Sequence, residues 1–262
     1  MNKIDIQLRA LKNKSEMGLM THAVIGYPTM KASEKIVGAL VSGGSDFIEL
    51  QIPFSDPVAD GPVIMQACDM ALKKGMTVKK AFAFIKKVST SLSIPLLIMA
   101  YYNSIFRYGV KKFCNETKEA SVAGLIVPDY PPEEETHEHL RKELDRRSVH
   151  LIRVVSPAST LSRLTLNAHQ ASGFVYCVSR FGITGKQKTL SPEIATYLSR
   201  VSKAFSLPKA VGFGISTPAH ITSLRSYAEI AIVGSSIIEL YRKSGIKTIE
   251  PFVRRLKLAC GR

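Results

Sequence analysis

Residues 46–61 read DFIELQIPFSDPVADG, and this stretch holds both a predicted strand and the loop that follows it. Its first half is a short apolar run with one carboxylate, Glu49, and no neighbouring basic residue. Its second half contains Pro53 and Pro57, which are incompatible with a regular helix or strand interior, and it ends in Asp60 and a glycine. A carboxylate on a buried strand carries a desolvation cost unless it is paired, hydrogen-bonded or protonated.

The stiff loop could place Asp60 over the end of the strand that carries Glu49. Two carboxylates in unlike environments are the groups that general acid–base chemistry uses. A structural alternative stays open at this point. In that alternative Glu49 makes an ordinary hydrogen bond at a strand end, and Asp60 belongs to an acidic turn.

The same strand-then-helix pattern extends over the whole chain. Short apolar runs without alternation are typical of parallel strands that are covered on both faces. We expect eight strands: 19–25, the first half of 46–61, 95–101, 123–127, 149–155, 173–178, 208–211 and 230–233. Helical spacing of apolar residues predicts helices at 2–14, 31–42, 63–74, 77–92, 110–121, 132–147, 161–171, 192–205, 218–227, 236–242 and 249–258.

Eight such units in a chain of 262 residues favour a closed barrel over an open sheet. The predicted fold is therefore an α/β protein, a (β/α)8 TIM barrel that forms a single domain over residues 1–262. It has an extra N-terminal helix and a short helix after the eighth strand.

The chain is strongly basic, with a formal net charge of +15 and an isoelectric point near 9.7. That balance suits nucleic acid, an anionic membrane or phosphorylated ligands. The basic residues, however, are spread as doublets over the expected helices, as is typical of solvated outer faces. The doublets are Lys73-Lys74, Lys79-Lys80, Lys86-Lys87, Lys111-Lys112, Arg146-Arg147 and Arg254-Arg255. We therefore expect no nucleic acid and no membrane among the partners.

The cysteines indicate the compartment. Cys68, Cys114, Cys177 and Cys260 lie far apart and form no CxxC pair, which favours free thiols in a reducing environment. The first 14 residues mix charged and apolar side chains, unlike a secretory signal. The longest apolar run, residues 94–102, is too short to cross a bilayer. A cytoplasmic protein is expected.

Glycine-rich turns follow the last three expected strands. They are residues 179–186 (SRFGITGK), 212–216 (GFGIS) and 234–236 (GSS). Glycines let backbone N–H groups approach an anion, and a helix N-terminus adds a favourable partial charge. In a barrel of this type, turns at these strand ends predict a phosphate site.

Other site classes find little support. No GxGxxG motif stands near the N-terminus, and neither a P-loop nor an HExxH motif occurs. His137 and His139 flank Glu138 on an expected acidic helix, where a solvated face is favoured over a metal site. We expect no metal, so the chemistry rests on the carboxylates and indicates proton transfer on a phosphorylated substrate.

The residues also resemble a known family. Residues 49–61 are similar to the signature of the tryptophan synthase alpha chain family, and the resemblance runs nearly end to end. It includes residues 99–103 (MAYYN), 127–131 (VPDYP), 179–185 (SRFGITG), 212–216 (GFGIS) and 234–235 (GS).

The resemblance implies a TIM barrel that cleaves indole-3-glycerol phosphate to indole and glyceraldehyde 3-phosphate, in tryptophan biosynthesis. It implies a lyase that docks on, and allosterically activates, a beta chain in an α2β2 heterotetramer. Pyridoxal phosphate is expected in that beta partner and no cofactor in this chain. Residues 53–60 and 129–131 would contribute to the face toward the partner.

The resemblance also implies roles for individual residues. Glu49 would be the general acid and base, and Asp60 would stabilise positive charge at the indole N–H. Tyr101 and Phe213 would line the indole pocket, and Thr184 would help a loop close over Asp60. The residues matching the phosphate cradle are Gly185, Gly214, Gly234 and Ser235.

Five positions depart from the family pattern, and one of them is Ser104, which stands where proline is frequent. Gln51 stands where the family almost always has glycine, and His22, Val24 and Tyr27 replace the usual aromatic, threonine and aspartate. His22 would face the substrate pocket. The departures motivate an alternative, a catalytically weakened subunit that serves mainly to activate the beta chain. If Gln51 only crowds the site, Gln51→Gly should not lower lyase activity.

Overall fold

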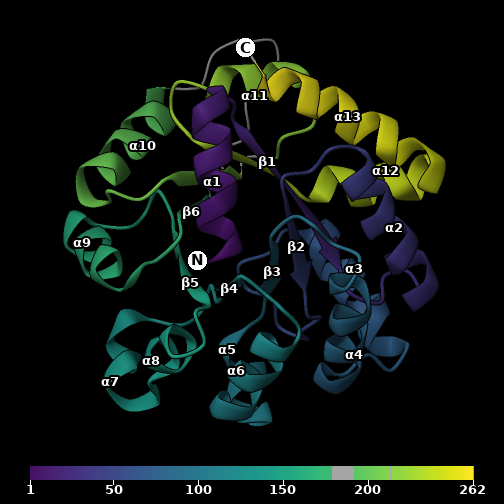
Figure 1. The fold of residues 1–262 in the computed structure, drawn as a ribbon, viewed down its shortest axis with the longest axis horizontal. Coiled ribbons are helices and arrows are strands. Elements are labelled where there is room, and N and C mark those ends of the chain that lie inside the picture. The colour runs from purple at the N-terminus through teal and green to yellow at the C-terminus, as the bar shows by residue number, and fades with distance from the viewer. Residues whose placement is uncertain (179–191, 213, 262) are drawn as a thin grey trace.

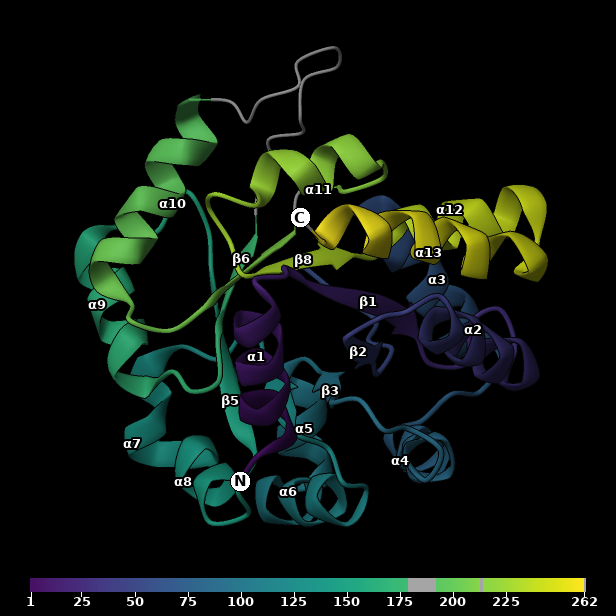
Figure 2. The ribbon, with the colours of Figure 1, turned by 45° about the horizontal axis from the view of Figure 1, so that its top comes forward.

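The eight strands pair in chain order and close into a parallel barrel (Figures 1 and 2). The computed structural model describes residues 1–178, 192–212 and 214–261. The strands are β1 (Gly18–Val24), β2 (Phe47–Gln51), β3 (Leu96–Met99), β4 (Gly124–Ile126), β5 (His150–Val155), β6 (Val175–Val178), β7 (Lys209–Gly212) and β8 (Ile230–Val233). The predicted TIM barrel is confirmed.

Helices surround the barrel and follow its strands (Figure 1). The α-helices are α1 (Lys3–Lys14), α2 (Met30–Ser42), α3 (Pro62–Lys73), α4 (Val78–Ser89), α5 (Tyr102–Tyr108), α6 (Val110–Glu119), α7 (Glu135–Glu138), α8 (Leu140–Asp145), α9 (Leu161–Gln170), α10 (Pro192–Ala204), α11 (Pro218–Leu224), α12 (Ser235–Ser244) and α13 (Ile249–Cys260). The described residues also form two 3₁₀ turns, η1 (Pro132–Glu134) and η2 (Ile246–Thr248).

Helix α1 lies across the N-terminal end of the barrel in both ribbon views (Figures 1 and 2). Its buried residues Ile4 and Leu11 join the cluster that fills the barrel interior. Asn2 caps the helix by accepting from the N–H of Ile4 at 2.8 Å, and its amide donates to the carbonyl oxygen of Ala123 at 2.7 Å. The barrel is therefore closed at this end, and its other end remains for a ligand.

The hydrophobic residues form two clusters, one inside the barrel and one between the strands and the helices. Phe47 and Phe174 pack edge to face inside the barrel, with ring centroids 6.3 Å apart. Because side chains alternate along a strand, the inward side that carries Phe47 also carries Glu49 and Gln51. The pattern of β2 thus directs both polar side chains away from the outer helices.

The single helix predicted for residues 132–147 is wrong. The chain instead forms η1, α7 and α8, and His139 between the last two adopts a left-handed backbone with φ of 55°. The side chain of Glu135 explains the restart, because its carboxylate accepts from the N–H of Arg141 at 2.8 Å and of Lys142 at 3.1 Å. These are the unpaired donors that open a new helix.

The strand predicted at residues 95–101 is shorter than expected, and a helix that was not predicted, α5, begins at Tyr102. Its seven residues are fewer than the window of about 11–18 residues over which helical periodicity can be read. The N–H of Tyr102 donates to the carboxylate of Asp129 at 2.7 Å, which connects the loops that follow β3 and β4.

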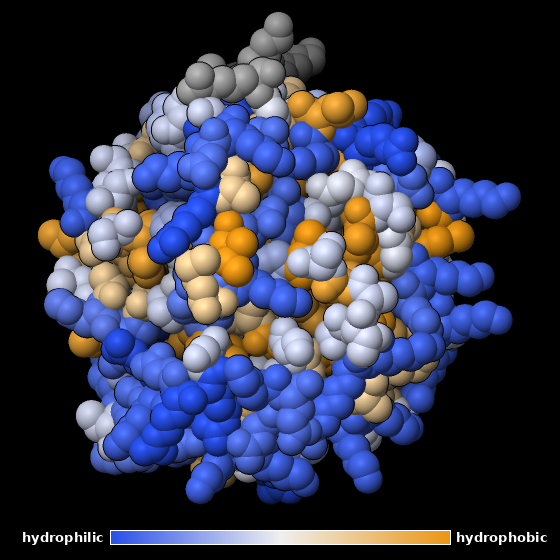
Figure 3. All heavy atoms as spheres, viewed as in Figure 1, coloured by the Kyte–Doolittle hydropathy of each residue, from blue (hydrophilic) through white to orange (hydrophobic). Residues whose placement is uncertain are grey.

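The outer surface accounts for the basic doublets. Their side chains are exposed except for Lys86 and Arg147, which are half-buried and paired with glutamates. Hydrophilic residues dominate the face seen in Figure 3, where apolar patches are small and separated. None of the helices in the described residues has the length and apolar character needed to cross a bilayer.

The packing of α1 against the N-terminal end of the barrel can be tested by Ile4→Ala. Ile4 is fully buried, so the substitution leaves a cavity and should lower the free energy of unfolding by about 2–5 kcal/mol. Ile6→Ala is the matched control, because Ile6 lies on the same helix but is 48% exposed. It should change stability by no more than about 0.5 kcal/mol in the same urea titration. Equal effects of the two substitutions would contradict this packing.

Candidate active site

A cavity of about 320 Å³ lies at the carboxyl ends of the strands. Glu49 and Asp60 both line it, which is the arrangement that the sequence predicted. The other lining residues are His22, Ala59, Gly61, Pro62, Val63, Ile64, Met99, Ile126, Pro128, Val154, Tyr176, Val178, Gly212, Gly214, Ile215, Ile232, Gly234, Ser235 and Glu239. The cavity is therefore walled by apolar side chains on one part and by glycine turns on another.

Glu49 is only 2% exposed, and its nearest charged neighbour comes from the adjacent strand. The register of β1 and β2 places His22 directly opposite Glu49, and Nδ1 of His22 lies 3.2 Å from Oε1 of Glu49. Oε2 of Glu49 and Nε2 of His22 are buried and have no hydrogen-bond partner among the described residues. Both groups can therefore still bond to a ligand.

Burial acts to lower the pKa of His22, but the charge and hydrogen bond of Glu49 outweigh it. The charge of Asp60 and the side chain of Gln51 act in the same direction as Glu49. The net result is a pKa of His22 above its ordinary value. The protonated form of His22 is thus favoured beside the Glu49 carboxyl group.

Asp60 is held by two side chains of the barrel wall. Nε2 of Gln51 donates to its Oδ2 at 2.7 Å, and the hydroxyl of Tyr101 donates to the same oxygen at 3.0 Å. The Tyr101 oxygen in turn accepts from the N–H of Ala59 at 3.0 Å, and its ring stacks on Phe54 with centroids 5.2 Å apart. The loop is therefore fastened to β2 and to the end of β3.

Burial raises the pKa of Asp60, although Gln51, His22 and Tyr101 all oppose that effect. The two carboxyl groups thus have unlike surroundings: Glu49 faces a histidine, and Asp60 faces an amide and a phenol. This difference is what the sequence suggested for an acid–base pair.

Tyr176 of β6 is a site residue that sequence reasoning missed. It lines the cavity, and removal from solvent together with the charges of Glu49 and Asp60 holds the pKa of Tyr176 well above its ordinary value. Burial alternates along β6, so Tyr176 lies on the other side of the strand from its two neighbours. The sequence alone could not show that this side faces the two carboxyl groups.

Of the three glycine turns predicted to bind phosphate, described residues of the second and third (212–216 and 234–236) line the same cavity as the carboxyl groups, and the first (179–186) lies outside the described residues. Gly214 has a φ of 65°, a conformation that favours glycine. Ser235 opens the 10-residue helix α12, and the hydroxyl of Ser236 donates to the carbonyl oxygen of Ile215 at 2.8 Å. This bond joins the turns after β7 and β8. Thr184, Gly185 and Phe213 lie outside the described residues.

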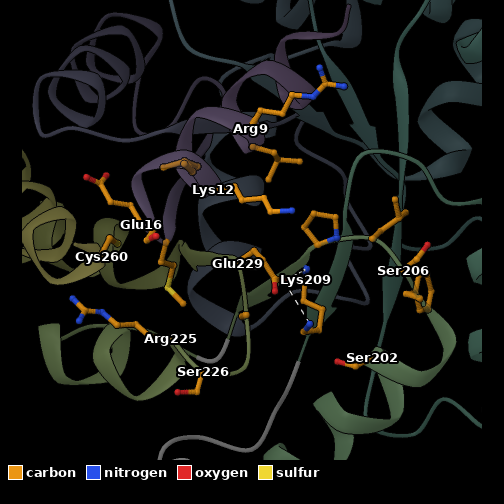
Figure 4. A pocket seen from close by; sticks show the side chains of 18 residues that line it. Arg9, Lys12, Glu16, Ser202, Ser206, Lys209, Arg225, Ser226, Glu229 and Cys260 are labelled. Atoms are coloured by element: carbon orange, nitrogen blue, oxygen red, sulfur yellow. Dashed lines mark hydrogen bonds and ion pairs between the residues drawn. The ribbon is translucent and has the colours of Figure 1, made fainter. Parts of the chain in front are cut away.

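A larger cavity of about 900 Å³ lies at the opposite end of the barrel, beside α1 (Figure 4). Its charged residues include Lys12, Lys209 and Glu229, and the last two form an ion pair at 3.5 Å. Chemistry in such barrels belongs to the carboxyl ends of the strands, whereas the other end serves stability. We therefore assign the smaller cavity as the candidate active site.

The sequence matches the family model of the tryptophan synthase alpha chain over residues 8–261. The chain belongs to this family. An alpha chain from Desulforapulum autotrophicum is 41% identical over 97% of this chain and 99% of its own length. One from Desulfotalea psychrophila is 40% identical over 95% and 98%.

Solved structures agree with this membership. A structure from Aquifex aeolicus has a TM-score of 0.89 at 32% identity and covers 100% of both chains. A structure of Mycobacterium tuberculosis tryptophan synthase has a TM-score of 0.91 at 29% identity, covering 100% of this chain and 99% of the other. The resemblance inferred from the motifs is confirmed.

In this member of the family, the two departures nearest the carboxyl groups are both buried. Gln51 is fully buried on β2 and does not have a positive φ, so the side chain does not strain the backbone there. His22 lines the cavity, as expected. Val24 and Tyr27 are also buried. Tyr27 accepts a hydrogen bond from Arg242 at 2.8 Å instead of facing solvent.

The His22–Glu49 pair predicts how stability depends on pH. Because the folded state raises the pKa of His22, protonated His22 stabilises the fold fully below its unfolded pKa. That contribution is lost as the pH rises through the folded pKa. The free energy of unfolding should therefore fall more steeply between about pH 6 and pH 8 in the wild type than in His22→Phe. Urea titrations over that range measure it, and parallel curves would contradict the pairing.

Proposed function

We propose that this chain is the alpha subunit of a tryptophan synthase and cleaves indole-3-glycerol phosphate to indole and glyceraldehyde 3-phosphate. The observation that carries the proposal is one cavity lined by Glu49, Asp60 and the turns at Gly214 and Gly234. It offers an acid–base group, a second carboxyl group and backbone amides suited to a phosphate. Membership of the family supports the same reaction.

The reaction needs a proton on the indole ring, because an indole carbanion is a poor leaving group. Glu49 donates that proton to the ring carbon bearing the glycerol chain, and positive charge develops at the indole nitrogen. Asp60 accepts the hydrogen bond of the indole N–H and stabilises the charge. The carbon–carbon bond then breaks and its electrons return to the ring. The hydroxyl proton of the glycerol chain passes to Glu49 as the aldehyde forms.

The phosphate of the substrate would bind to the backbone amides across the cavity. Gly214, Gly234 and Ser235 are the described members of this cradle, and the N-terminus of α12 adds a favourable partial charge. Gly185, Thr184 and Phe213 belong to the proposal as the matching family positions. Tyr101 takes a positioning role, since it acts on the substrate site through its bond to Asp60.

The proposal includes a beta chain as partner, in an α2β2 assembly that contains pyridoxal phosphate in the beta subunit and no cofactor in this one. Residues 53–60 and 129–131 would lie toward that partner. The bond between Tyr102 and Asp129 connects the second segment to the end of β3. A cytoplasmic location suits the four cysteines, which are buried and free.

Glu49→Gln and Asp60→Asn each should lower kcat for lyase turnover by about 10²-fold or more, because each removes a group that carries or stabilises charge. Both variants should still fold and still activate the beta chain in its reaction of indole with serine. Asp69→Asn is the control, since Asp69 is paired with Lys73 on the solvent side of α3. Turnover is measured with indole-3-glycerol phosphate, with and without a beta chain.

Full turnover in either carboxyl variant would show that the roles are assigned wrongly. A wild-type complex that uses free indole but not indole-3-glycerol phosphate would instead support a subunit that only activates the beta chain. The assay therefore also decides how efficient the lyase is.

A further inference from the structure

The reaction described above leaves two buried polar side chains unused, His22 and Gln51, although both contact its carboxyl groups. Resting on the proposed function, we propose that they are positioning residues of the lyase: His22 shares the proton of Glu49, and Gln51 holds Asp60 and joins it to that pair. The family motif has an aromatic residue and a glycine at these places, so the device belongs to this chain's own sequence.

The position of His22 is fixed from several sides. Its ring is 4% exposed and lies opposite Glu49 across the β1–β2 pairing. Gly234 of the next turn packs against it, since a Cβ built there would lie 3.4–3.6 Å from atoms of His22. A small space behind the ring is lined by Tyr27 and Tyr241. The imidazole therefore cannot swing away from Glu49 without displacing a neighbouring element.

The contact gives the pair a single shared proton. Glu49 passes this proton to the ring carbon, and the hydroxyl proton released by bond cleavage returns to the pair. Between the two transfers Glu49 is an anion and His22 is neutral, and the N–H at Nδ1 of His22, 3.2 Å from Oε1, donates a hydrogen bond that stabilises the carboxylate. The pair loses its ability to donate once the pH exceeds the raised pKa of His22.

Gln51 connects this pair to the second carboxyl group. Its Nε2 donates to Oδ2 of Asp60 at 2.7 Å, and Tyr101 donates to the same oxygen. Oδ1 of Asp60 is thereby left for the indole N–H. Oε1 of Gln51 is buried and has no partner of full hydrogen-bond geometry among the described residues, but the side chain lies close enough to His22 to favour its protonated form. The amide thus lies between the imidazole and Asp60.

Several other titratable groups lie around His22 and can influence its protonation. They are Glu49 on β2, Asp60 on the loop after it, Tyr176 on β6, and Glu239 of α12, which lines the cavity, together with Tyr27 and Tyr241 behind the ring. Burial and the charges of Glu49 and Asp60 raise the pKa of Tyr176, so this phenol stays neutral beside the pair. The carboxyl groups therefore determine how His22 titrates.

An NMR titration tests the shared proton without any need for turnover. In the full chain labelled at its histidines, His22 should titrate above its ordinary pKa of about 6.5, and Glu49→Gln should lower its midpoint by about one unit or more. His22→Phe assigns the signal, and exposed His169 serves as the internal control that does not move. A midpoint of His22 that is unchanged in Glu49→Gln would overturn the coupling.

The pH profile of the lyase tests the positioning role. In the complex with a beta chain, His22→Phe and His22→Asn should both shift the alkaline limb of kcat/KM to lower pH, because neither side chain carries the shared proton. His169→Gln is the matched control and should keep the wild-type profile. If the alkaline limb of kcat/KM stayed at the wild-type pH in both His22 variants, His22 would have only a packing role.

Gln51 is tested by Gln51→Gly and by Gln51→Met, which keeps the length but removes the amide. The contact with Asp60 reverses the earlier expectation for Gln51→Gly, and both variants should lower kcat by about tenfold. Equal or higher turnover in both would overturn the role of Gln51. A wild-type complex without turnover would instead disprove the proposed function, and the NMR titration would still decide the coupling.

Discussion

The parallel pairing of β1 with β2 is the constraint on which the site depends. It sets His22 opposite Glu49 and Val24 opposite Gln51. A shift of one residue would turn Glu49 toward the outer helices, where a carboxylate in apolar surroundings would have no partner. The same pairing directs Gln51 to the inner side, from which it reaches Asp60. One register thus determines the surroundings of both carboxyl groups.

The loop after β2 adds the second constraint. Prolines limit its conformations, and Tyr101 fixes it by accepting from the N–H of Ala59 while donating to Asp60. The side chain that anchors the loop is therefore also the one that orients its carboxyl group. The geometry of Asp60 depends on the barrel wall, which is more rigid than a free loop.

The sequence was sufficient for the barrel because its information is local: each apolar run and each helical pattern can be read by itself. It was also sufficient to bring Glu49, Asp60 and the glycine turns to one end, since that follows from the direction of the strands. The contact between His22 and Glu49 could not be read in this way, because it depends on register between strands 27 residues apart. The helix restart at His139 depends on a side chain, Glu135, whose capping role leaves no periodic signal.

The buried polar atoms without partners indicate that the departures at positions 22 and 51 serve ligand binding, not stability. Oε2 of Glu49, Nε2 of His22 and Oε1 of Gln51 are buried and unpaired among the described residues, and each such group destabilises the fold by about 1–3 kcal/mol. An aromatic residue and a glycine at positions 22 and 51 would avoid two of these costs. Their replacement by a histidine and a glutamine is thus unfavourable for stability alone. A ligand that offers a donor or acceptor to these atoms recovers part of the cost on binding, which ties the departures to the cavity and its substrate.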